Sequence, residues 1–411
     1  MPRNISSVGV IGLGYIGLPT AAILADHGVT TIGMDVSERN VAAVNKGELP
    51  FVEPGLREVL ERAVSRGTLT ATTQTPETDA YIVAVPTPFT ETHSADLSYI
   101  EAAADGIAAK LTGGELIILE STSPPGATEH LAHRILAARP DLEAADILVA
   151  HCPERVLPGK IMEEMITNDR IIGGLTPEAA EAARDLYSAF CKGEFLLTDA
   201  RTAEMAKLTE NSFRDVNIAF ANELSVISHK LGIDVWELIE LANHHPRVNI
   251  LQPGPGVGGH CIAVDPWFIV DAAPEEANLI RTARQTNDAK PEWVLGRIEQ
   301  ALETAGTSPT VALLGLAFKA NIDDLRESPS LHIAEQLARR APAAQLLAVE
   351  PHIQALPESL AQPGNVRLSA LHDALESADV VVLLVDHQVF KDLDAARLGD
   401  ATVIDTRGIW R

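Results

Sequence analysis

The stretch Val8–Asp35, VGVIGLGYIGLPTAAILADHGVTTIGMD, decides the fold of the N-terminal part of the chain. Val8–Ile11 is a short apolar strand, and three glycines at GxGxxG spacing, Gly12-Leu-Gly14-Tyr-Ile-Gly17, follow it at once. A helical segment and a second strand that ends in Asp35 come next. This order is that of a dinucleotide-binding unit, in which a pyrophosphate approaches the helix N-terminus and an acidic residue meets the ribose hydroxyls.

Asp35 also predicts which dinucleotide is bound. A carboxylate at this position accepts hydrogen bonds from the ribose of NAD, whereas the 2′-phosphate of NADP would meet a like charge. Arg39 lies four residues further along the chain, and its cation leaves NADP open as an alternative. We therefore expect NAD as the cofactor.

Strands and helices continue to alternate up to about residue 198, which is typical of an α/β fold with a parallel sheet. Two later strands, Tyr81–Val85 and Glu115–Leu119, are followed by Thr87 and Thr122. Doubly wound sheets bind ligands at the carboxyl ends of their strands, so these hydroxyls are candidate cofactor contacts, with ordinary turn residues as the alternative. We predict a Rossmann-like NAD-binding domain over residues 1–198.

The composition limits the classes of function. The 411 residues are enough for two or three domains, and 57 acidic against 32 basic residues give a formal net charge of −25. Nucleic acid and anionic membranes are therefore poor partners. The three cysteines show neither disulfide-framework nor zinc-site spacing, so we expect no metal. No leader segment and no apolar run of the ~18 residues of a membrane span is found, and we expect a cytoplasmic protein.

A long helix is predicted for Thr202–Lys230, because this segment has neither proline nor glycine and has apolar residues at helical spacing. Lys207, Asn211 and Arg214 fall on one face of it, with a solvated polar stripe as the alternative. A helix this long without its own sheet usually packs against a partner helix. We therefore expect a homodimer that associates through a central helical domain, residues 199–306.

The loop Gly254–Trp267, GPGVGGHCIAVDPW, carries the candidate catalytic chemistry. Its glycines and prolines argue against regular structure and let the backbone pass close to a ligand or another segment. Cys261 is followed four residues later by Asp265, which suits a thiol nucleophile with an acid or base beside it. On the loop alone, a tight turn with a buried, inert cysteine is an equal alternative.

The last part of the chain, residues 307–411, is predicted to form a second α/β domain. Its first strand, Val311–Gly315, leads into a turn with one glycine where a dinucleotide fingerprint has three. We therefore expect this domain to bind a nucleotide without being a second dinucleotide site. Phe318-Lys319 and Arg326 follow the strand and place cations near the expected phosphate position, with surface charge as the alternative.

Four stretches, in this order along the chain, resemble the UDP-glucose/UDP-N-acetylmannosamine dehydrogenases. They are GLGYIGLP (12–19), EMAKLTENSFRDVNIAFANEL (204–224), GPGVGGHCIAVDP (254–266) and LGLAFKANIDDLRESPS (314–330). UDP-glucose members usually have Ser-Cys-Phe-x-Lys-Asp at the loop. This chain has His260-Cys-Ile-Ala-Val-Asp265, which is similar to the UDP-N-acetyl-D-mannosamine 6-dehydrogenase subgroup and lacks the loop lysine. The resemblance favours a catalytic Cys261 over an inert one.

The resemblance implies a four-electron oxidation of the C6 alcohol of a UDP-sugar to a carboxylate with two NAD⁺. Cys261 would capture the aldehyde as a thiohemiacetal, and the second oxidation would give a thioester that water hydrolyses. Lys207 would act as acid/base and stabilise the oxyanion, Asn211 would add a neutral donor, and Asp265 would orient Lys207 or water. Glu154 would help to position the hydrolytic water.

The resemblance also implies two sets of binding residues. Arginine suits a diphosphate because its guanidinium can make bidentate contacts. The implied UDP-sugar residues are Arg155, Val156, Lys207, Asn211, Arg214, His245, Arg247, Gly258, Phe318, Lys319 and Arg407. The implied NAD residues are Gly12, Gly14, Tyr15, Ile16, Gly17, Asp35, Thr87, Thr122 and Arg326.

The sugar stays open at this point. UDP-N-acetyl-D-mannosamine, oxidised to its uronate, is the expected substrate, and UDP-N-acetylglucosamine and UDP-glucose are alternatives. A two-electron β-hydroxyacid dehydrogenase or an NAD-sensing binding protein would share the opening fold but needs neither a nucleophilic cysteine nor the second α/β domain. The predicted fold class is α/β, with two doubly wound Rossmann-like domains joined by a central helical domain.

Overall fold

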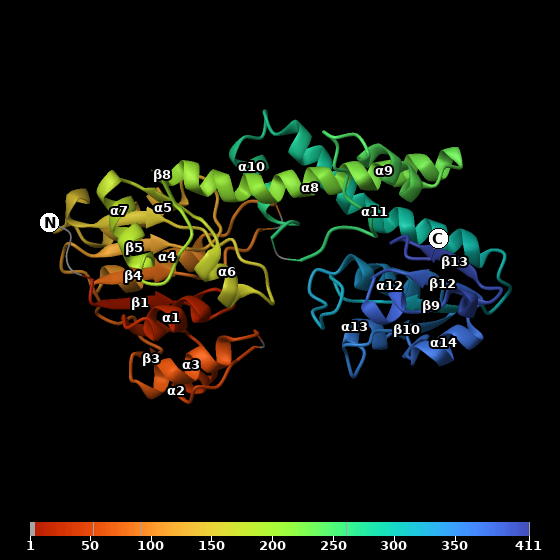
Figure 1. The fold of residues 1–411 in the computed structure, drawn as a ribbon, viewed down its shortest axis with the longest axis horizontal. Coiled ribbons are helices and arrows are strands. Elements are labelled where there is room, and N and C mark those ends of the chain that lie inside the picture. The colour runs from red at the N-terminus through yellow and green to blue at the C-terminus, as the bar shows by residue number, and fades with distance from the viewer. Residues whose placement is uncertain (1–4, 52, 91, 260, 411) are drawn as a thin grey trace. The chain divides into compact units, whose positions relative to one another are not determined.

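The computed structural model describes residues 5–51, 53–90, 92–259 and 261–410. The chain divides into two compact units, Met1–Glu210 and Asn211–Arg411, each visible in Figure 1. Helix α8 (Ala200–Leu231) is continuous across the boundary between them. It covers the long helix predicted from the absence of glycine and proline, with one or two more residues at each end.

The first unit contains an eight-stranded sheet in the order β3-β2-β1-β4-β5-β6-β7-β8. β1 lies between β2 and β4 and pairs with both in parallel, so the sheet has its topological switch point at the end of β1. β7 runs antiparallel to β6, and β8 runs parallel to β7. The strands are β1 (Ser7–Ile11), β2 (Thr30–Met34), β3 (Leu69–Thr72), β4 (Ala80–Val83), β5 (Leu116–Leu119), β6 (Leu148–His151), β7 (Arg170–Gly174) and β8 (Phe195–Asp199).

Helices cover both faces of this sheet. Successive side chains of a strand point to opposite faces, so β1 places Val8 and Val10 in one apolar cluster and Ile11 in another. The first cluster is completed by α1, α3, α6 and α7, and the second by α4 and α5. The helices are α1 (Gly17–Asp26), α2 (Glu38–Asn45), α3 (Leu56–Ser65), α4 (Ser98–Ala108), α5 (Ala127–Ala138), α6 (Ile161–Thr167) and α7 (Pro177–Tyr187).

The second unit begins with helices. The C-terminal part of α8 belongs to this unit, and α9 (Val235–Asn243), α10 (Asp265–Ala272) and α11 (Asn278–Leu302) follow it along the chain. The expectation that no helix enters the cysteine loop was wrong at its end, because Asp265–Trp267 form the first turn of α10. Pro266 fits there, since a first-turn amide has no partner within its helix.

A five-stranded parallel sheet, in the order β11-β10-β9-β12-β13, completes the second unit. Apolar clusters on its two faces are closed by α11 and α12 on one side and by α14 and α15 on the other. The strands are β9 (Thr310–Leu314), β10 (Gln345–Val349), β11 (Val366–Leu368), β12 (Val380–Leu383) and β13 (Thr402–Asp405). The helices are α12 (Pro329–Arg340), α13 (Glu358–Ala361), α14 (Leu371–Ser377) and α15 (Gln388–Lys391).

The predicted fold class is confirmed: the chain has two mainly parallel sheets, and a run of helices separates them in the sequence. The strands that sequence reasoning missed, β3 and β11, are short edge strands with few apolar residues. The predicted domain boundaries after residues 198 and 306 stay a proposal. Among the described helices, none is long and apolar enough to cross a bilayer.

Candidate active site

The glycine turn after β1 lies at the switch point of the first sheet. Gly12 has a φ of +97°, and a Cβ there would lie 2.5 Å from the carbonyl oxygen of Ala84. A Cβ on Gly17 would lie 1.9 Å from the Gly12 oxygen, so α1 can start here only with glycine. A Cβ on Gly14 would meet no described atom within 4 Å. The turn therefore faces open space in which a pyrophosphate can approach the N-terminus of α1.

Asp35 follows β2 and is hydrogen-bonded to the same turn. Its Oδ2 accepts from the Leu13 amide at 3.0 Å, and its Oδ1 accepts from the Ser37 amide at 2.8 Å. Tyr15 and Ile16 continue the turn into α1, and the Tyr15 ring stacks on Phe51 with centroids 4.3 Å apart. The carboxylate thus lies beside the glycines, as ribose recognition requires.

Thr87 has the property expected of a ligand-binding hydroxyl. Its Oγ1 is buried and has no hydrogen-bond partner among the described residues. Leaving a buried hydroxyl unpaired costs free energy, and a polar atom of a ligand beyond β4 would remove that cost. Thr122 lies three residues beyond the end of the neighbouring strand β5. Together with the glycine turn, these positions fit a dinucleotide.

Arg326, the remaining residue predicted to bind NAD, belongs to the second unit. There it pairs with Asp324 at 2.6 Å. The structure therefore places the other predicted NAD residues in the first unit and this one in the second.

The cysteine loop packs directly against other parts of the second unit. A Cβ on Gly258 would lie 2.5 Å from the Glu327 oxygen and 2.7 Å from Pro329, and a Cβ on Gly259 would lie 3.2 Å from the Phe318 ring. Side chains at these positions would push the loop away. The glycines are therefore needed to seat the loop on Phe318 and on the start of α12.

The side chain of Arg407 lies against Gly254, the first residue of the same loop. Its Nη1 would be 2.5 Å from a Cβ on Gly254, and its Nη2 pairs with Asp386 at 3.1 Å. Its Nε is buried without a partner among the described residues. The structure thus brings three of the predicted substrate residues to the cysteine loop, namely Gly258, Phe318 and Arg407.

Cys261 is exposed at the end of this loop, just after His260, which lies outside the described residues. Its carbonyl oxygen accepts from the amides of Val264 at 3.1 Å and Asp265 at 2.8 Å, which closes the turn into α10. Asp265 is buried, and its Oδ2 accepts from Asn211 Nδ2 at 2.5 Å. Two predicted catalytic residues, one on α8 and one on α10, are therefore in direct contact.

The other two cysteines are buried. Burial raises the pKa of the Cys152 thiol to about 12. Because the thiolate is the nucleophile, Cys152 is poorly suited to covalent catalysis near neutral pH. Cys261 is the cysteine that a substrate can reach.

Lys207 precedes Asn211 by one turn of α8, so the two side chains point to the same side of the helix. Lys207 is half-buried. The other predicted cations are exposed, and no described contact joins them to the cysteine loop; they are Arg214, His245, Arg247 and Lys319.

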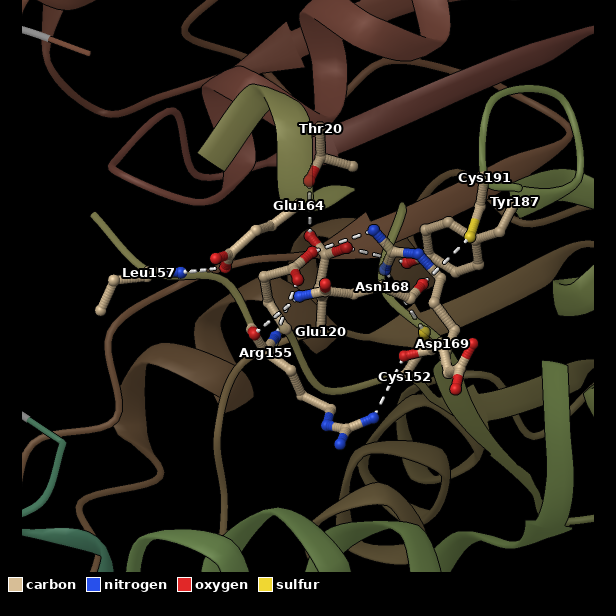
Figure 2. A network of polar contacts seen from close by, with 12 residues as sticks. Thr20, Glu120, Cys152, Arg155, Leu157, Glu164, Asn168, Asp169, Tyr187 and Cys191 are labelled. Carbon is tan, nitrogen blue, oxygen red and sulfur yellow. Dashed lines mark hydrogen bonds and ion pairs between the residues drawn. The ribbon is translucent and has the colours of Figure 1, made fainter. Parts of the chain in front are cut away.

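Two buried glutamates, Glu120 after β5 and Glu154 after β6, form an acidic cluster. Figure 2 shows Glu120 with its partners Thr20 and Tyr187. Glu154 Oε2 pairs with Arg170 Nη2 at 3.1 Å. Glu120 accepts hydrogen bonds from Thr20 and Tyr187, each at 3.0 Å. Burial and the nearby charge of Glu154 raise the pKa of Glu120 to about 7. Glu120 can therefore gain or lose a proton near neutral pH beside Glu154. Sequence reasoning found Glu154 but missed Glu120, although an acid directly after the apolar strand β5 was a signal.

Arg155 is held beside this cluster (Figure 2). Its guanidinium pairs with Glu210 at 2.6 Å. It also donates to the backbone carbonyl oxygen of Asp169 at 3.1 Å, a contact that Figure 2 shows. Val156 packs against the apolar cluster of the first unit. Of these two predicted substrate residues, Arg155 has the polar group that a ligand could engage.

Asn222, on α8, anchors the cysteine loop and was not predicted. Its Oδ1 accepts from the Gly254 amide at 2.9 Å, and its Nδ2 donates to Asn287 Oδ1 at 2.9 Å. Asn287 in turn donates to Asp215 Oδ1 at 2.8 Å, and Arg284 pairs with the same carboxylate. All four polar side chains are buried. The first residue of the loop is therefore fixed by a polar network between α8 and α11.

Three possible metal ligands gather beyond β10, with ligand atoms within 4.8 Å of one another: Glu350, His352 and His387. The Asn321 amide donates to His387 Nδ1 at 2.9 Å, which assigns the proton to Nε2, and Nε2 donates to Glu350 at 3.0 Å. Glu350 also accepts from the Leu316 amide at 2.7 Å. Because both ring nitrogens of His387 are engaged, these residues fix the turn after β9 and do not fit a metal site.

Comparison with known proteins adds to this geometry. Models of the UDP-glucose/GDP-mannose dehydrogenase family match the chain in three consecutive parts: the NAD binding domain at residues 6–191, the central domain at 201–289 and the UDP binding domain at 312–411. The matched parts contain the glycine turn, α8 with the cysteine loop, and the second sheet, respectively.

Similar relatives and solved structures cover nearly the whole chain. The NDP-N-acetyl-D-galactosaminuronic acid dehydrogenase of Ralstonia nicotianae is 57% identical over 98% of this chain and 96% of its own length. The UDP-N-acetyl-D-mannosamine dehydrogenase of Escherichia coli K12 is 52% identical over 99% of this chain and 100% of its own length. The structure of UDP-D-ManNAc dehydrogenase from Pyrococcus horikoshii matches with a TM-score of 0.89 and 39% identity, covering 98% of this chain and 96% of that one.

Proposed function

This chain belongs to the UDP-glucose/GDP-mannose dehydrogenase family, and on that premise we propose that it oxidises C6 of UDP-N-acetyl-D-mannosamine to the carboxylate. The family resemblance and the NAD cofactor predicted from the sequence are confirmed, and the chain is a nucleotide-sugar dehydrogenase. The choice of sugar is supported by the His-Cys-Ile-Ala-Val-Asp loop and by relatives named for that substrate.

UDP-N-acetyl-D-galactosamine is a second candidate substrate. It is favoured by the relative that is 57% identical and is named for N-acetyl-D-galactosaminuronic acid. These UDP-sugars share the same C6 alcohol, so only contacts around the ring can discriminate between them. The test is NADH yield per sugar with UDP-N-acetyl-D-mannosamine, UDP-N-acetyl-D-galactosamine, UDP-N-acetyl-D-glucosamine and UDP-glucose. Two NADH per molecule, at the highest kcat/KM for the mannosamine sugar, is the expected result, and preference for another sugar would overturn this choice.

The arrangement around Cys261 supports a covalent route. NAD⁺ held at the glycine turn and Asp35 would supply the hydride acceptor, with one molecule consumed in each of the two oxidations. The Cys261 thiolate adds to the C6 aldehyde, and the second oxidation converts this adduct to a thioester. Water then hydrolyses the thioester and releases the acid, because a thiolate is a good leaving group. An amide has two N–H donors, so Asn211 can give one to Asp265 and the other to the oxygen that gains charge.

Two further groups complete the proposed chemistry. Lys207, one turn from Asn211 on α8, is the proposed acid/base and a second donor to the oxyanion. Glu154 is held by Arg170 at 3.1 Å, which gives its carboxylate a fixed orientation toward the hydrolytic water in this proposal. The neighbouring Glu120 offers a nearby site for the proton that hydrolysis releases.

NAD⁺ should be preferred over NADP⁺ by about two orders of magnitude in kcat/KM or more, because a 2′-phosphate beside Asp35 would place like charges together at a cost of several kcal/mol. The measurement is steady-state turnover with both cofactors. Asp35→Ala should lower the ratio of kcat/KM with NAD⁺ to kcat/KM with NADP⁺. Glu38→Ala, which removes a carboxylate three residues further on, should leave this ratio unchanged. Equal use of NADP⁺ by the wild type would contradict this and would point to Arg39 as a phosphate ligand.

We also propose that two copies of the chain associate through α8. Four large apolar side chains lie on one face of this helix, and they remain 71%, 53%, 44% and 63% exposed: Phe213, Phe220, Ile227 and Leu231. The opposite face carries the buried polar residues that hold the cysteine loop, such as Asn222. An apolar stripe of this kind on a single chain is typical of a protein–protein contact.

Phe220→Glu is expected to convert the dimer to a monomer, because it places a charge in the middle of this stripe. Light scattering coupled to size-exclusion chromatography measures the mass. Leu279→Glu, at a residue that is 69% exposed on α11, is the control and should stay dimeric. A wild-type monomer at working concentrations would rule out this interface.

A further inference from the structure

A cavity of about 300 Å³ lies within the second unit, and none of the residues that line it is predicted to bind the sugar nucleotide. Its walls come from the end of α8, the start of α9, the middle of α11 and the end of β13. Two indole rings, Trp236 and Trp293, and three basic side chains, His229, Lys290 and Arg297, line it. This combination of aromatic and basic walls is unusual in a chain with so strong an excess of acidic residues.

The three basic groups are gathered around one indole. Lys290 is only 4% exposed, its Nζ donates to Ser225 Oγ, and it lies 4.1 Å from the centroid of Trp293. The guanidinium carbon of Arg297 lies 5.4 Å from the same centroid, and the His229 ring meets it edge-on at 5.6 Å. Cation–π contacts hold these side chains in place but do not neutralise their charge.

The carboxylates that line the cavity are already engaged by backbone amides. Asp234 accepts from the amides at the start of α9, and Asp405 accepts from the amides of Arg407 and Gly408 at 2.8 and 2.7 Å. Within the described ranges, no carboxylate oxygen lies within 4.0 Å of the side-chain nitrogens of Lys290 or Arg297. Elsewhere on the same helix, Arg284 has two such partners. Lys290 and Arg297 therefore have no ion-pair partner among the described residues, and the two lining carboxylates are held by backbone amides instead.

These groups also disfavour one another's charged forms. Burial, and then the charge of Arg297, lowers the pKa of Lys290 to about 7. Burial and the charges of Arg297 and Lys290 lower the pKa of His229. A negative ion in the cavity would remove this repulsion and favour all three charged forms.

We propose that this cavity binds a small oxyanion, a phosphate or carboxylate group, between Lys290, Arg297 and His229. The apolar walls, which include Trp236, exclude water and strengthen each charged contact. None of the lining residues is a proposed substrate residue, although Arg407 directly follows the lining residue Thr406. Lys290 is also joined to the cysteine loop through Ser225 and Asn222. An oxyanion that draws Lys290 away from Ser225 therefore acts next to the residue that anchors Gly254.

Inorganic phosphate is the probe, and the full-length protein with saturating UDP is the sample, so that the proposed diphosphate subsite is filled. Thermal unfolding and tryptophan fluorescence are followed as phosphate is added, with sodium chloride at matched ionic strength as the reference. The wild type should gain stability with phosphate and show a saturable fluorescence change from Trp293. Lys290→Met and Arg297→Met should each bind phosphate roughly tenfold more weakly or worse. Arg281→Met, on the same helix outside the cavity, should behave like the wild type.

The unfolding temperature of the variants without phosphate shows whether Lys290 binds a ligand or only stabilises the fold. If Lys290 serves a ligand, Lys290→Met should unfold at an unchanged or higher temperature without phosphate, because a buried charge has been removed. If the lysine is structural, the variant should unfold at a lower temperature and keep the full phosphate response. That outcome, or a wild type that does not respond to phosphate, would overturn the proposal. Should Lys290→Met fail to fold, the phosphate response and the unfolding temperature of Arg297→Met and His229→Gln test the proposal in its place.

Discussion

Replacement of Cys261 by alanine is expected to lower four-electron turnover on the order of 10⁴-fold or more, the size of effect that follows removal of a covalent nucleophile. The variant has no sulfur to capture the aldehyde, while the glycine turn, Asp35 and the seat of the loop are untouched. Binding of NAD⁺ and of the UDP-sugar should therefore be retained. Steady-state NADH production measures the loss, and calorimetric titration measures the binding.

Cys261→Ser gives a sharper view of the same step. A serine keeps the shape but forms its anion far less readily near neutral pH and is a poorer leaving group. Turnover should stall, and an ester on this residue should be detectable by mass spectrometry. Cys191→Ala is the matched control and should still yield two NADH per sugar. Near-wild-type four-electron turnover by Cys261→Ala would contradict the covalent route.

Asn222→Leu is expected to lower both stability and kcat. Leucine leaves the Gly254 amide and the Oδ1 atom of Asn287 without their partners in a buried place, at about 1–3 kcal/mol for each group. The free energy of unfolding should fall by roughly 2–6 kcal/mol. Because a displacement near 1 Å can cost about 10²-fold in rate, kcat should fall by one to two orders of magnitude as the loop carrying Cys261 loses its anchor.

The control for Asn222→Leu is Asn217→Leu on the same helix. Among the described residues, the Asn217 side chain donates only to the Phe213 carbonyl within α8, and it is not part of the network under the loop. It should change the free energy of unfolding little and leave kcat near the wild-type value. If Asn222→Leu loses stability but keeps its kcat, the network supports the fold without positioning the loop.

The first unit was predictable from sequence because its signals are local. The glycine spacing, the strand before it and Asp35 all lie within 28 consecutive residues, and the structure joins them by short-range contacts such as the 3.0 Å bond from the Leu13 amide. The long helix α8 was predictable for the same reason, since helix formation depends on neighbours along the chain.

The seat of the cysteine loop could not be predicted in this way. The residue types pointed to a nucleophile, but the contacts that hold the loop come from Phe318 and Arg407, more than fifty residues further along the chain. Asn222 and Glu120 were missed for a related reason. A polar residue on a helix or after a strand has the same sequence pattern whether it faces solvent or the core, and only the folded structure shows that both are buried.

The turn after β9 has a consequence for how many dinucleotides one chain can hold. Gly12 and Gly315 occupy the same place in their sheets, each donating to the end of the next strand at 2.8 and 2.9 Å. Asp35 and Glu350 follow those strands, but Glu350 is buried and its oxygens accept from His387 and from backbone amides. Four protein donors thus already engage this buried carboxylate, so Glu350 is poorly placed to take the role that Asp35 has toward a ribose. The expected binding stoichiometry is therefore one NAD per chain, although the strand–turn–acid order occurs twice.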